Sequence, residues 1–253
     1  MQWSDEGVIL SVKPHGETAA VAEIFTRAHG RHLGLVHGGR SRKLRPVLQT
    51  GNQVDAVWKA RLAEHLGHVA VELRKGYAAQ AMEDPLALAG LTSLCTLARL
   101  LPERDPHPSL YEVTLFVLGY LDEPEVWPAL LVRWELALLD ELGFGLDLAS
   151  CAATGANDNL IYVSPKSGRA VSAAAGEPYK ERLLRLPAFL AKGRQGTATL
   201  EDVLAGTELT GHFLEARVLG PRGDVLPEAR LRFRDLLAKR AAGGGAGTTS
   251  PLP

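Results

Sequence analysis

Hydrophobic and polar positions alternate along the first 78 residues in short stretches that indicate β-strands. In the stretch QVDAVWKAR at 53–61, Val54, Ala56, Trp58 and Ala60 share one side, which is typical of a half-exposed strand. A glycine turn at 28–31 joins two further apolar runs into a predicted hairpin. In total we expect five strands, at 7–12, 19–27, 32–37, 53–61 and 69–75.

Five short strands so close together favour a small closed barrel, and the OB-fold is the commonest design of that size. An OB-fold usually carries an insertion between its third and fourth strands. Residues 37–51 (HGGRSRKLRPVLQTG), called here the basic segment, occupy that place in the chain.

After residue 82 the apolar spacing changes to three and four residues, which predicts helices. The first should begin at Asp84 as N-cap with Pro85 next, and a later one should end at Gly143 as a left-handed C-cap. Another begins at Thr199 and should end at Gly206. The intervening stretch 146–178 reads as loop with a short strand at 160–163.

The predicted fold class is therefore α+β with two domains. We expect an N-terminal β-barrel (OB-fold) at 1–80 and an α-helical domain at 81–240. The tail 241–253, GGGAGTTSPLP with two preceding alanines, lacks the apolar residues needed for a packed core and should be disordered.

Charge is distributed unevenly along the 253 residues, although the formal net charge is only −1. Residues 1–78 hold 11 Lys and Arg against 7 Asp and Glu, whereas the remainder holds 17 against 22. A basic front and an acidic rear suggest two domains with different partners. We expect a cytoplasmic protein, because the sequence shows no signal peptide, no apolar run of 18 residues and only two cysteines.

The basic segment carries the most specific signal in the chain. It places Arg40, Arg42, Lys43 and Arg45 within six residues, and no acid occurs between Thr26 and Val54. Four like charges repel one another, so a bound anion would stabilise them, and the guanidinium group matches phosphate geometry. The predicted phosphate-binding set also includes cations on neighbouring strands: Arg27, Arg31, Lys59 and Arg61.

One alternative interpretation and one missing feature argue against phosphate binding by the basic segment. A charged loop is often no more than a solvated surface, and a single-strand binder also needs aromatic platforms for stacking bases. The front domain offers only Trp3, Phe25, Trp58 and Tyr77. Phe25 and Trp58 lie in apolar runs, so core packing is the simpler reading of both.

No catalytic constellation occurs, and we expect neither an enzyme nor a cofactor. The GxSxG, HExxH, GxxxxGK[ST] and GxGxxG motifs are all absent from the sequence. Metal binding is not expected either, because Cys151 is followed by Thr154 where a CxxC pair needs a second thiolate, and Cys95 lies in an apolar helical pattern. Both cysteines read as small buried residues.

The last predicted helix interleaves apolar residues with a basic flank that has the charge to hold an acidic peptide. The flank consists of Arg230, Arg232, Arg234, Lys239 and Arg240.

The sequence resembles the bacterial RecO family of recombination mediators and DNA repair proteins, of the alphaproteobacterial kind. The resemblance rests on GVILSVKPHGETAAVAEIFTRAHGRHLGLVHGGRSRKLRPVLQTGNQV in the front half and on RWELALLDELGFGLDLASCAATGANDNLIYVSPKSGRAVSAAAGEPYKERLLRLPAFL in the rear half. Together the two halves cover nearly everything except the glycine-rich tail.

The resemblance implies an N-terminal OB-fold, a helical C-terminal domain, and binding to single- and double-stranded DNA. It implies annealing of complementary strands and assistance to RecA on strands coated with single-strand-binding protein (SSB), together with RecR and, in some pathways, RecF. It also implies binding of the SSB C-terminal tail by the helical domain, and association with the nucleoid. Many relatives carry a four-cysteine zinc motif, of which this chain keeps only Cys151.

Two rival classes remain open from the residues alone. An OB-fold with a basic segment also suits an RNA-binding protein, and a dominant helical domain suits a protein-interaction scaffold. Competition between RNA and DNA oligomers distinguishes an RNA-binding protein from a DNA-binding one. A barrel without DNA affinity would favour the interaction scaffold.

Overall fold

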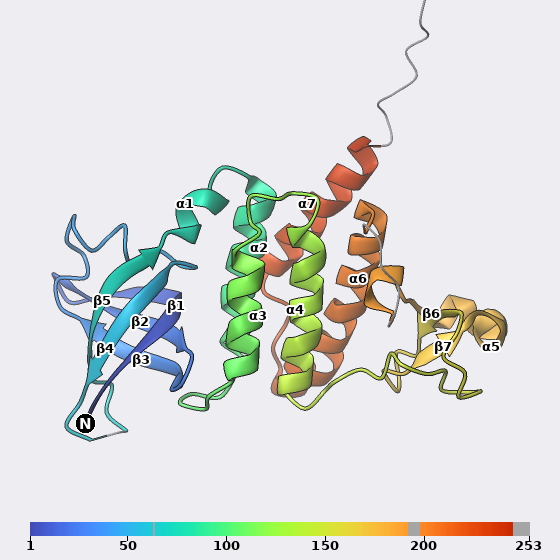
Figure 1. Ribbon diagram of the computed structural model, residues 1–253, viewed down its shortest axis with the longest axis horizontal. Helices are drawn as coiled ribbons and strands as arrows, with labels where there is room; N and C mark the ends of the chain where they lie inside the picture. The colour runs from blue at the N-terminus through green and yellow to red at the C-terminus, as the bar shows by residue number, and fades with distance from the viewer. Residues whose placement is uncertain (63, 192–197, 245–253) are drawn as a thin grey trace, which may run out of the picture. The chain divides into compact units, whose positions relative to one another are not determined.

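The computed structural model describes residues 1–62, 64–191 and 198–244. The chain forms two compact units, Met1–Trp127 and a second that begins at Pro128. The five N-terminal strands are β1 (Gln2–His15), β2 (Ala19–Thr26), β3 (Gly30–Val36), β4 (Gln53–Lys59) and β5 (His68–Lys75). They close into a barrel in the order β1-β2-β3-β5-β4 (Figure 1), which confirms the predicted OB-fold class.

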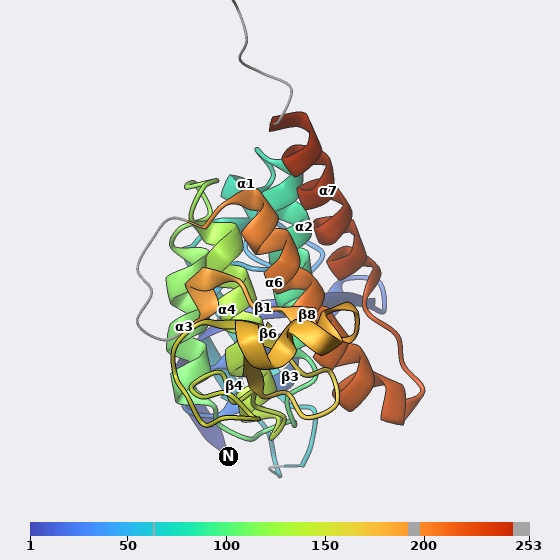
Figure 2. The ribbon, with the colours of Figure 1, turned by 90° about the vertical axis from the view of Figure 1, so that its right-hand side faces the viewer.

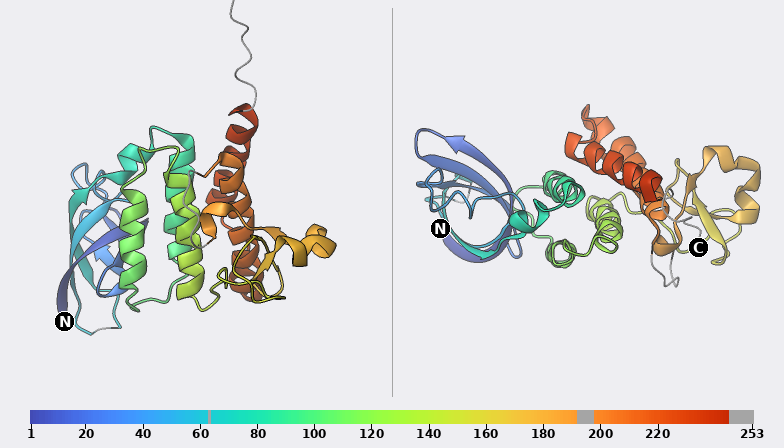
Figure 3. Two further views of the ribbon diagram at one scale, coloured as in Figure 1. Left: turned by 45° about the vertical axis from the view of Figure 1, so that its right-hand side comes forward. Right: turned by 90° about the horizontal axis from the view of Figure 1, so that it is seen from above.

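Strand β1 is longer than its apolar run because it pairs along both of its sides. Its first half is antiparallel to β4 and its second half to β2, with a register shift between Ile9 and Ser11 that bends the strand. Strand β5 meets β3 in parallel at the single pair Leu35–His68, which closes the ring. The right-hand view of Figure 3 shows the blue strands of the barrel from above. The barrel core includes Ile9, Ile24, Val54 and Trp58, all fully or nearly fully buried.

Three helices belong to the first compact unit together with the barrel: α1 (Tyr77–Ala81), α2 (Pro85–Ala98) and α3 (Pro108–Leu118). Helix α2 begins as predicted, because Asp84 accepts a hydrogen bond from the Leu86 amide at 3.0 Å and Pro85 follows. The rings of Phe25 in β2 and Tyr111 in α3 meet edge to face at 5.6 Å. The compact unit therefore extends past the expected strand-to-helix border near residue 80.

The second unit is built on α4 (Trp127–Glu141), α6 (Leu200–Phe213) and α7 (Glu228–Gly244). Figure 2 shows α7 running beside α6. Between α4 and α6 lies a three-stranded sheet in the order β7-β6-β8, made of β6 (Leu160–Val163), β7 (Ala170–Ser172) and β8 (Leu184–Arg185). The short elements α5 (Ala173–Gly176), η1 (Glu177–Arg182) and η2 (Ala188–Leu190) adjoin this sheet, and η3 (Leu214–Leu219) and η4 (Gly220–Arg222) follow α6.

Most of the predicted helix signals in this unit are confirmed. Gly143 has a φ of 81° after α4, and Thr199 forms a capping box with Asp202 at the start of α6. Strand β6 stands at the predicted 160–163, whereas β7 and β8 were not predicted because two or three residues carry no periodic signal.

Two expectations about this unit are corrected. Helix α6 does not end at Gly206 but continues to Phe213. A Cβ atom at Gly206 would lie 2.9 Å from Val132 Cγ1 and 3.2 Å from the Phe189 ring, so this glycine serves close helix packing. Helix α7 continues to Gly244, four residues into the tail expected to be disordered. Extending an existing helix costs less than starting one, because each residue that becomes ordered gains one backbone hydrogen bond. Residues 245–253 lie outside the described residues.

Candidate nucleic-acid interface

The basic segment follows β3 directly and is fastened to the barrel at both ends. The Arg40 amide donates to the Thr18 carbonyl at 3.0 Å, beside the β1–β2 turn. At the other end the Asn52 side chain donates to the carbonyls of Pro46 and Val47 at 2.9 and 3.2 Å and accepts from the Ala78 amide at 3.0 Å. Both ends of this 15-residue segment are thereby hydrogen-bonded to neighbouring parts of the first unit.

The four cations of the basic segment are exposed, and carboxylates do not neutralise them. Arg40 Nη1 donates to the carbonyls of Gly16 and Glu17, both at 3.0 Å. Within the described residues, no carboxylate pairs with Arg40, Arg42, Lys43 or Arg45. Their positive charge is therefore available to an external anion.

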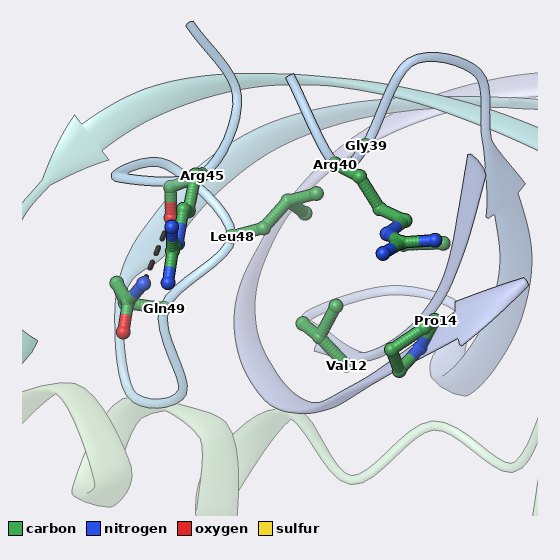
Figure 4. A pocket seen from close by; sticks show the side chains of 8 residues that line it. Val12, Pro14, Gly39, Arg40, Arg45, Leu48 and Gln49 are labelled. Carbon is green, nitrogen blue, oxygen red and sulfur yellow. Dashed lines mark hydrogen bonds between the residues drawn. The ribbon is translucent and has the colours of Figure 1, made fainter. Parts of the chain in front are cut away.

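A hollow of about 430 Å³ lies against the basic segment, and Figure 4 shows its lining. We call it the Leu48 hollow. In this view Leu48 reaches in above Val12, with Arg40 and Arg45 on opposite sides of it. Its lining consists of Val12, Pro14, Ala20, Gly39, Arg40, Arg45, Leu48 and Gln49.

A second hollow, of about 470 Å³, contacts the basic segment through His37 and Leu44. Its remaining lining comes from β3, β4 and β5 and includes Lys59. The imidazole rings of His37 and His68 stack there with centroids 4.6 Å apart. The structure thus brings Lys59 next to the basic segment. Arg61 is also exposed, on the β4–β5 connection.

The other two predicted cations are engaged within the first unit. Arg27 Nε lies 2.8 Å from Glu112 Oε1 in α3, and Arg27 Nη1 lies 3.7 Å from Glu6. Arg31 pairs with Glu23 and Glu103 and donates from Nε to the Leu101 carbonyl at 3.0 Å. The Arg31 side chain is only 14% exposed, so its geometry fits a structural role better than contact with phosphate.

Glu23 is the acidic centre of this structural cluster. It is 3% exposed, accepts from Ser11 Oγ at 2.9 Å and from Arg99 Nε at 2.7 Å, and pairs with Arg31. Burial alone would raise the pKa of Glu23, but the hydrogen bonds from Arg31 and Ser11 and the charge of Arg99 outweigh it and lower the pKa. The ionised carboxylate therefore stabilises the barrel against α2.

We expect Glu23→Gln to lower the free energy of unfolding at pH 7 and to flatten its fall in acid. A carboxyl group with a lowered folded pKa stabilises fully above its unfolded pKa of about 4.3, and this contribution is lost as pH falls through the folded value. Urea unfolding between pH 7 and pH 3 measures both effects. Glu112→Gln is the control, because its pair with Arg27 is half exposed and worth under about 1 kcal/mol. Parallel pH profiles of wild type and Glu23→Gln would contradict the expectation.

The aromatic residues of the barrel are used internally. Phe25, Trp58 and Tyr77 are 0%, 2% and 4% exposed, which confirms the core reading of the first two. Trp58 Nε1 donates to the carbonyls of Leu33 and Leu66, and Trp3 stacks with His29 and with Trp58 at 4.3 and 5.6 Å. Burial lowers the pKa of His32, which packs against the same rings, so this histidine adds no cation near neutral pH.

The surroundings of Cys151 do not suit zinc. The thiol is buried and within hydrogen-bonding distance of Ser172, at 3.3 Å from its amide and 3.5 Å from its hydroxyl. In the described ranges no three side chains from His, Cys, Asp and Glu come together as a metal site would need. Burial would raise the pKa of Cys151, but hydrogen bonds from Ser172 and Thr154 lower it to about 6. Cys95 is buried as expected.

Sequence reasoning missed the apolar part of this surface. The apolar residues come from two strands and the basic segment, and only the closed barrel brings them together: Val12, Pro14, Ala20 and Leu48.

None of the described helices is long and apolar enough to cross a membrane.

Comparison with known proteins covers nearly the whole chain. Residues 1–77 match the family model "Recombination protein O N terminal", and residues 82–224 match "Recombination protein O C terminal". DNA repair protein RecO of Methylobacterium nodulans is 59% identical over 237 residues, 92% of this chain and 96% of that protein. The RecO proteins of Methylorubrum populi and Beijerinckia indica are 57% and 56% identical, covering 92% and 94% of this chain and 97% and 96% of theirs. Barrel, helices and relatives agree, and the chain belongs to the RecO family.

Proposed function

We propose that this chain is a DNA repair and recombination mediator that binds single- and double-stranded DNA through its barrel. The observation that carries the proposal is the basic segment, four exposed cations without a carboxylate partner in the described residues, on a protein of the RecO family. Contacts to phosphate carry no sequence information, so binding is independent of base sequence.

The mechanism is electrostatic rather than catalytic. Two DNA strands repel each other through their phosphates, and a protein that covers both with Arg and Lys lowers that repulsion and lets complementary bases pair. Lys59 extends the charge of the basic segment across β4, and Arg61 extends it onto the following loop. Because the protein makes and breaks no bond, it needs no catalytic residue.

The partners in this proposal follow from family membership. The protein assists the loading of RecA on SSB-coated single strands, together with RecR and RecF, and its helical unit binds the SSB C-terminal tail. The exposure of side chains limits which residues of the basic flank on α7 could contact such a tail. Arg230, the first member of the basic flank on α7, is 1% exposed and cannot meet a peptide, whereas Arg232 and Lys239 are exposed.

A strand-annealing assay tests the proposal. Complementary oligomers should anneal faster with the protein than without it, both as bare strands and with one strand coated with SSB. An RNA competitor in the same assay distinguishes an RNA-binding protein, which would prefer RNA over DNA of equal length. Absence of any acceleration on bare strands would overturn the annealing role.

We expect single-strand affinity to fall with salt along a log–log slope of about −3. Four phosphate contacts release their counterions with a slope of about −0.7 each on a single strand. Fluorescence anisotropy of a labelled thymine oligomer between about 0.05 and 0.3 M salt measures the slope. A slope near zero would show that cations do not carry the binding.

A further inference from the structure

The Leu48 hollow combines an apolar floor with two guanidinium groups, and the proposed function does not yet account for it. Val12 and Pro14 from β1, Ala20 from β2 and Leu48 form the apolar surface. Arg40 and Arg45 flank it, and no acidic residue is among its lining. The volume of about 430 Å³ lies in the range of small-molecule sites in proteins.

The two arginines are held differently, and each arrangement suits a different part of a nucleotide. Arg40 Nη1 is fixed by the carbonyls of Gly16 and Glu17, which leaves its Nε and Nη2 hydrogens without an acceptor in the described part of the chain. Such a preoriented donor suits a phosphate oxygen. Arg45 has no side-chain partner among the described residues, and a planar guanidinium can stack on the face of a base.

Gly39 sets the depth of the hollow. A Cβ atom there would lie 2.8 Å from the Ala20 Cβ and 3.2 Å from Leu48 Cδ1. Only glycine lets the basic segment lie this close to β2 and to Leu48 beside Arg40.

The Phe, Trp and Tyr rings of residues 1–78 offer bases few places to stack. Phe25, Trp58 and Tyr77 are buried, and the Trp3 ring already stacks with His29 and Trp58. A strand that runs along the basic segment would place its phosphates on the cations, and the Leu48 hollow gives a base an apolar surface between Arg40 and Arg45.

We propose that the Leu48 hollow receives one unstacked nucleobase of a single strand, with the adjoining phosphate on Arg40. The inference rests on the proposed DNA binding and adds a means of distinguishing single strands from duplexes. A base inside a duplex is stacked and paired, so it cannot enter, and duplex DNA contacts only the cations.

The first test compares wild-type affinity for two oligomers with the same number of phosphates, one of thymidines and one of abasic sites. We expect the thymine oligomer to bind at least about fivefold more tightly, which is the low end of the effect of one stacked base. Equal affinities at every salt concentration would overturn the inference and leave electrostatic DNA binding intact. This comparison needs no variant.

The second test fills the hollow with Val12→Phe, which keeps every cation. We expect this variant to bind thymine and abasic oligomers equally, with unchanged duplex affinity and an unchanged salt slope. Lys13→Ala is the matched control, because Lys13 lies between Val12 and Pro14 in β1 and points to the opposite face. It should keep the preference for thymine over abasic oligomers while losing one cation.

The outcomes separate the inference from the function on which it rests. A Val12→Phe protein that retains the thymine preference, or that loses duplex and abasic affinity in proportion, would show that the hollow takes no base. If wild type binds neither single strand nor duplex, the proposed function itself fails. Should Val12→Phe fail to fold, the wild-type comparison of thymine and abasic oligomers still decides.

Discussion

Arg230→Ala is expected to destabilise the helical unit by about 3–5 kcal/mol, the typical cost of breaking a buried ion pair. Arg230 in α7 and Glu135 in α4 are each 1% exposed. Arg230 Nε and Nη2 donate to the two oxygens of Glu135 at 2.5 and 3.0 Å, and Nη2 also donates to the Thr207 carbonyl at 2.6 Å. Truncation leaves the Glu135 carboxylate buried, and the Thr210 hydroxyl is its one remaining side-chain donor among the described residues.

Urea unfolding of the whole chain measures this loss in the transition that includes α4, α6 and α7. Arg232→Ala is the matched control, because Arg232 lies on the same helix but is exposed, and its loss should change stability by less than about 0.5 kcal/mol. The double replacement Glu135→Leu with Arg230→Met removes both charges and should recover most of the stability. An Arg230→Ala protein as stable as the Arg232→Ala protein would refute the assigned role.

The role of Arg230 illustrates what a helical pattern cannot reveal. Arg230, Arg232 and Arg234 occur at every second position of α7 and look equivalent in the sequence. In the structure Arg230 is buried against Glu135, whereas Arg234 is exposed and pairs with Asp235. The partner Glu135 is 95 residues away, and no local rule connects the two.

Local signals sufficed where the fold depends on neighbouring residues. Alternation of apolar and polar residues gave the strands of the barrel, and caps such as Asp84 and Thr199 gave helix starts, because these contacts span only a few residues. The helix end predicted at Gly206 was wrong for the opposite reason. Its contacts with Val132 and Phe189 are tertiary, and they permit a glycine inside a helix.

The candidate site likewise has features that consecutive residues reveal and features that depend on tertiary contacts. The charge of the basic segment is a property of consecutive residues and was visible in the sequence. The sequence did not reveal which cations remain available to bind an anion. The carboxylates that pair with Arg27 and Arg31 come from α3, β1, β2 and the α2–α3 connection, which are distant in the sequence. The Leu48 hollow also depends on barrel closure, which brings β1, β2 and the basic segment together.

Replacement of Arg40, Arg42, Lys43 and Arg45 by Ala is expected to weaken single-strand binding several-hundred-fold at about 0.1 M salt. Four contacts with a slope of about −0.7 each contribute nearly three powers of ten at that concentration, because the counterion term scales with the logarithm of salt. The log–log slope should become much shallower in the same variant, because only cations outside the basic segment, such as Lys59 and Arg61, remain. Anisotropy titrations with thymine oligomers at several salt concentrations measure both quantities, and duplex affinity should fall as well.

The control must carry the same change in net charge, since four lost cations alone weaken attraction to DNA at long range. Four exposed cations of the helical unit serve this purpose: Arg182, Arg222, Arg232 and Lys239. Their replacement by Ala gives the same net charge but leaves the basic segment intact, so affinity should fall by less than about tenfold and the slope should stay near −3. Equal losses in the two variants would mean that total charge, and not the basic segment, determines DNA binding.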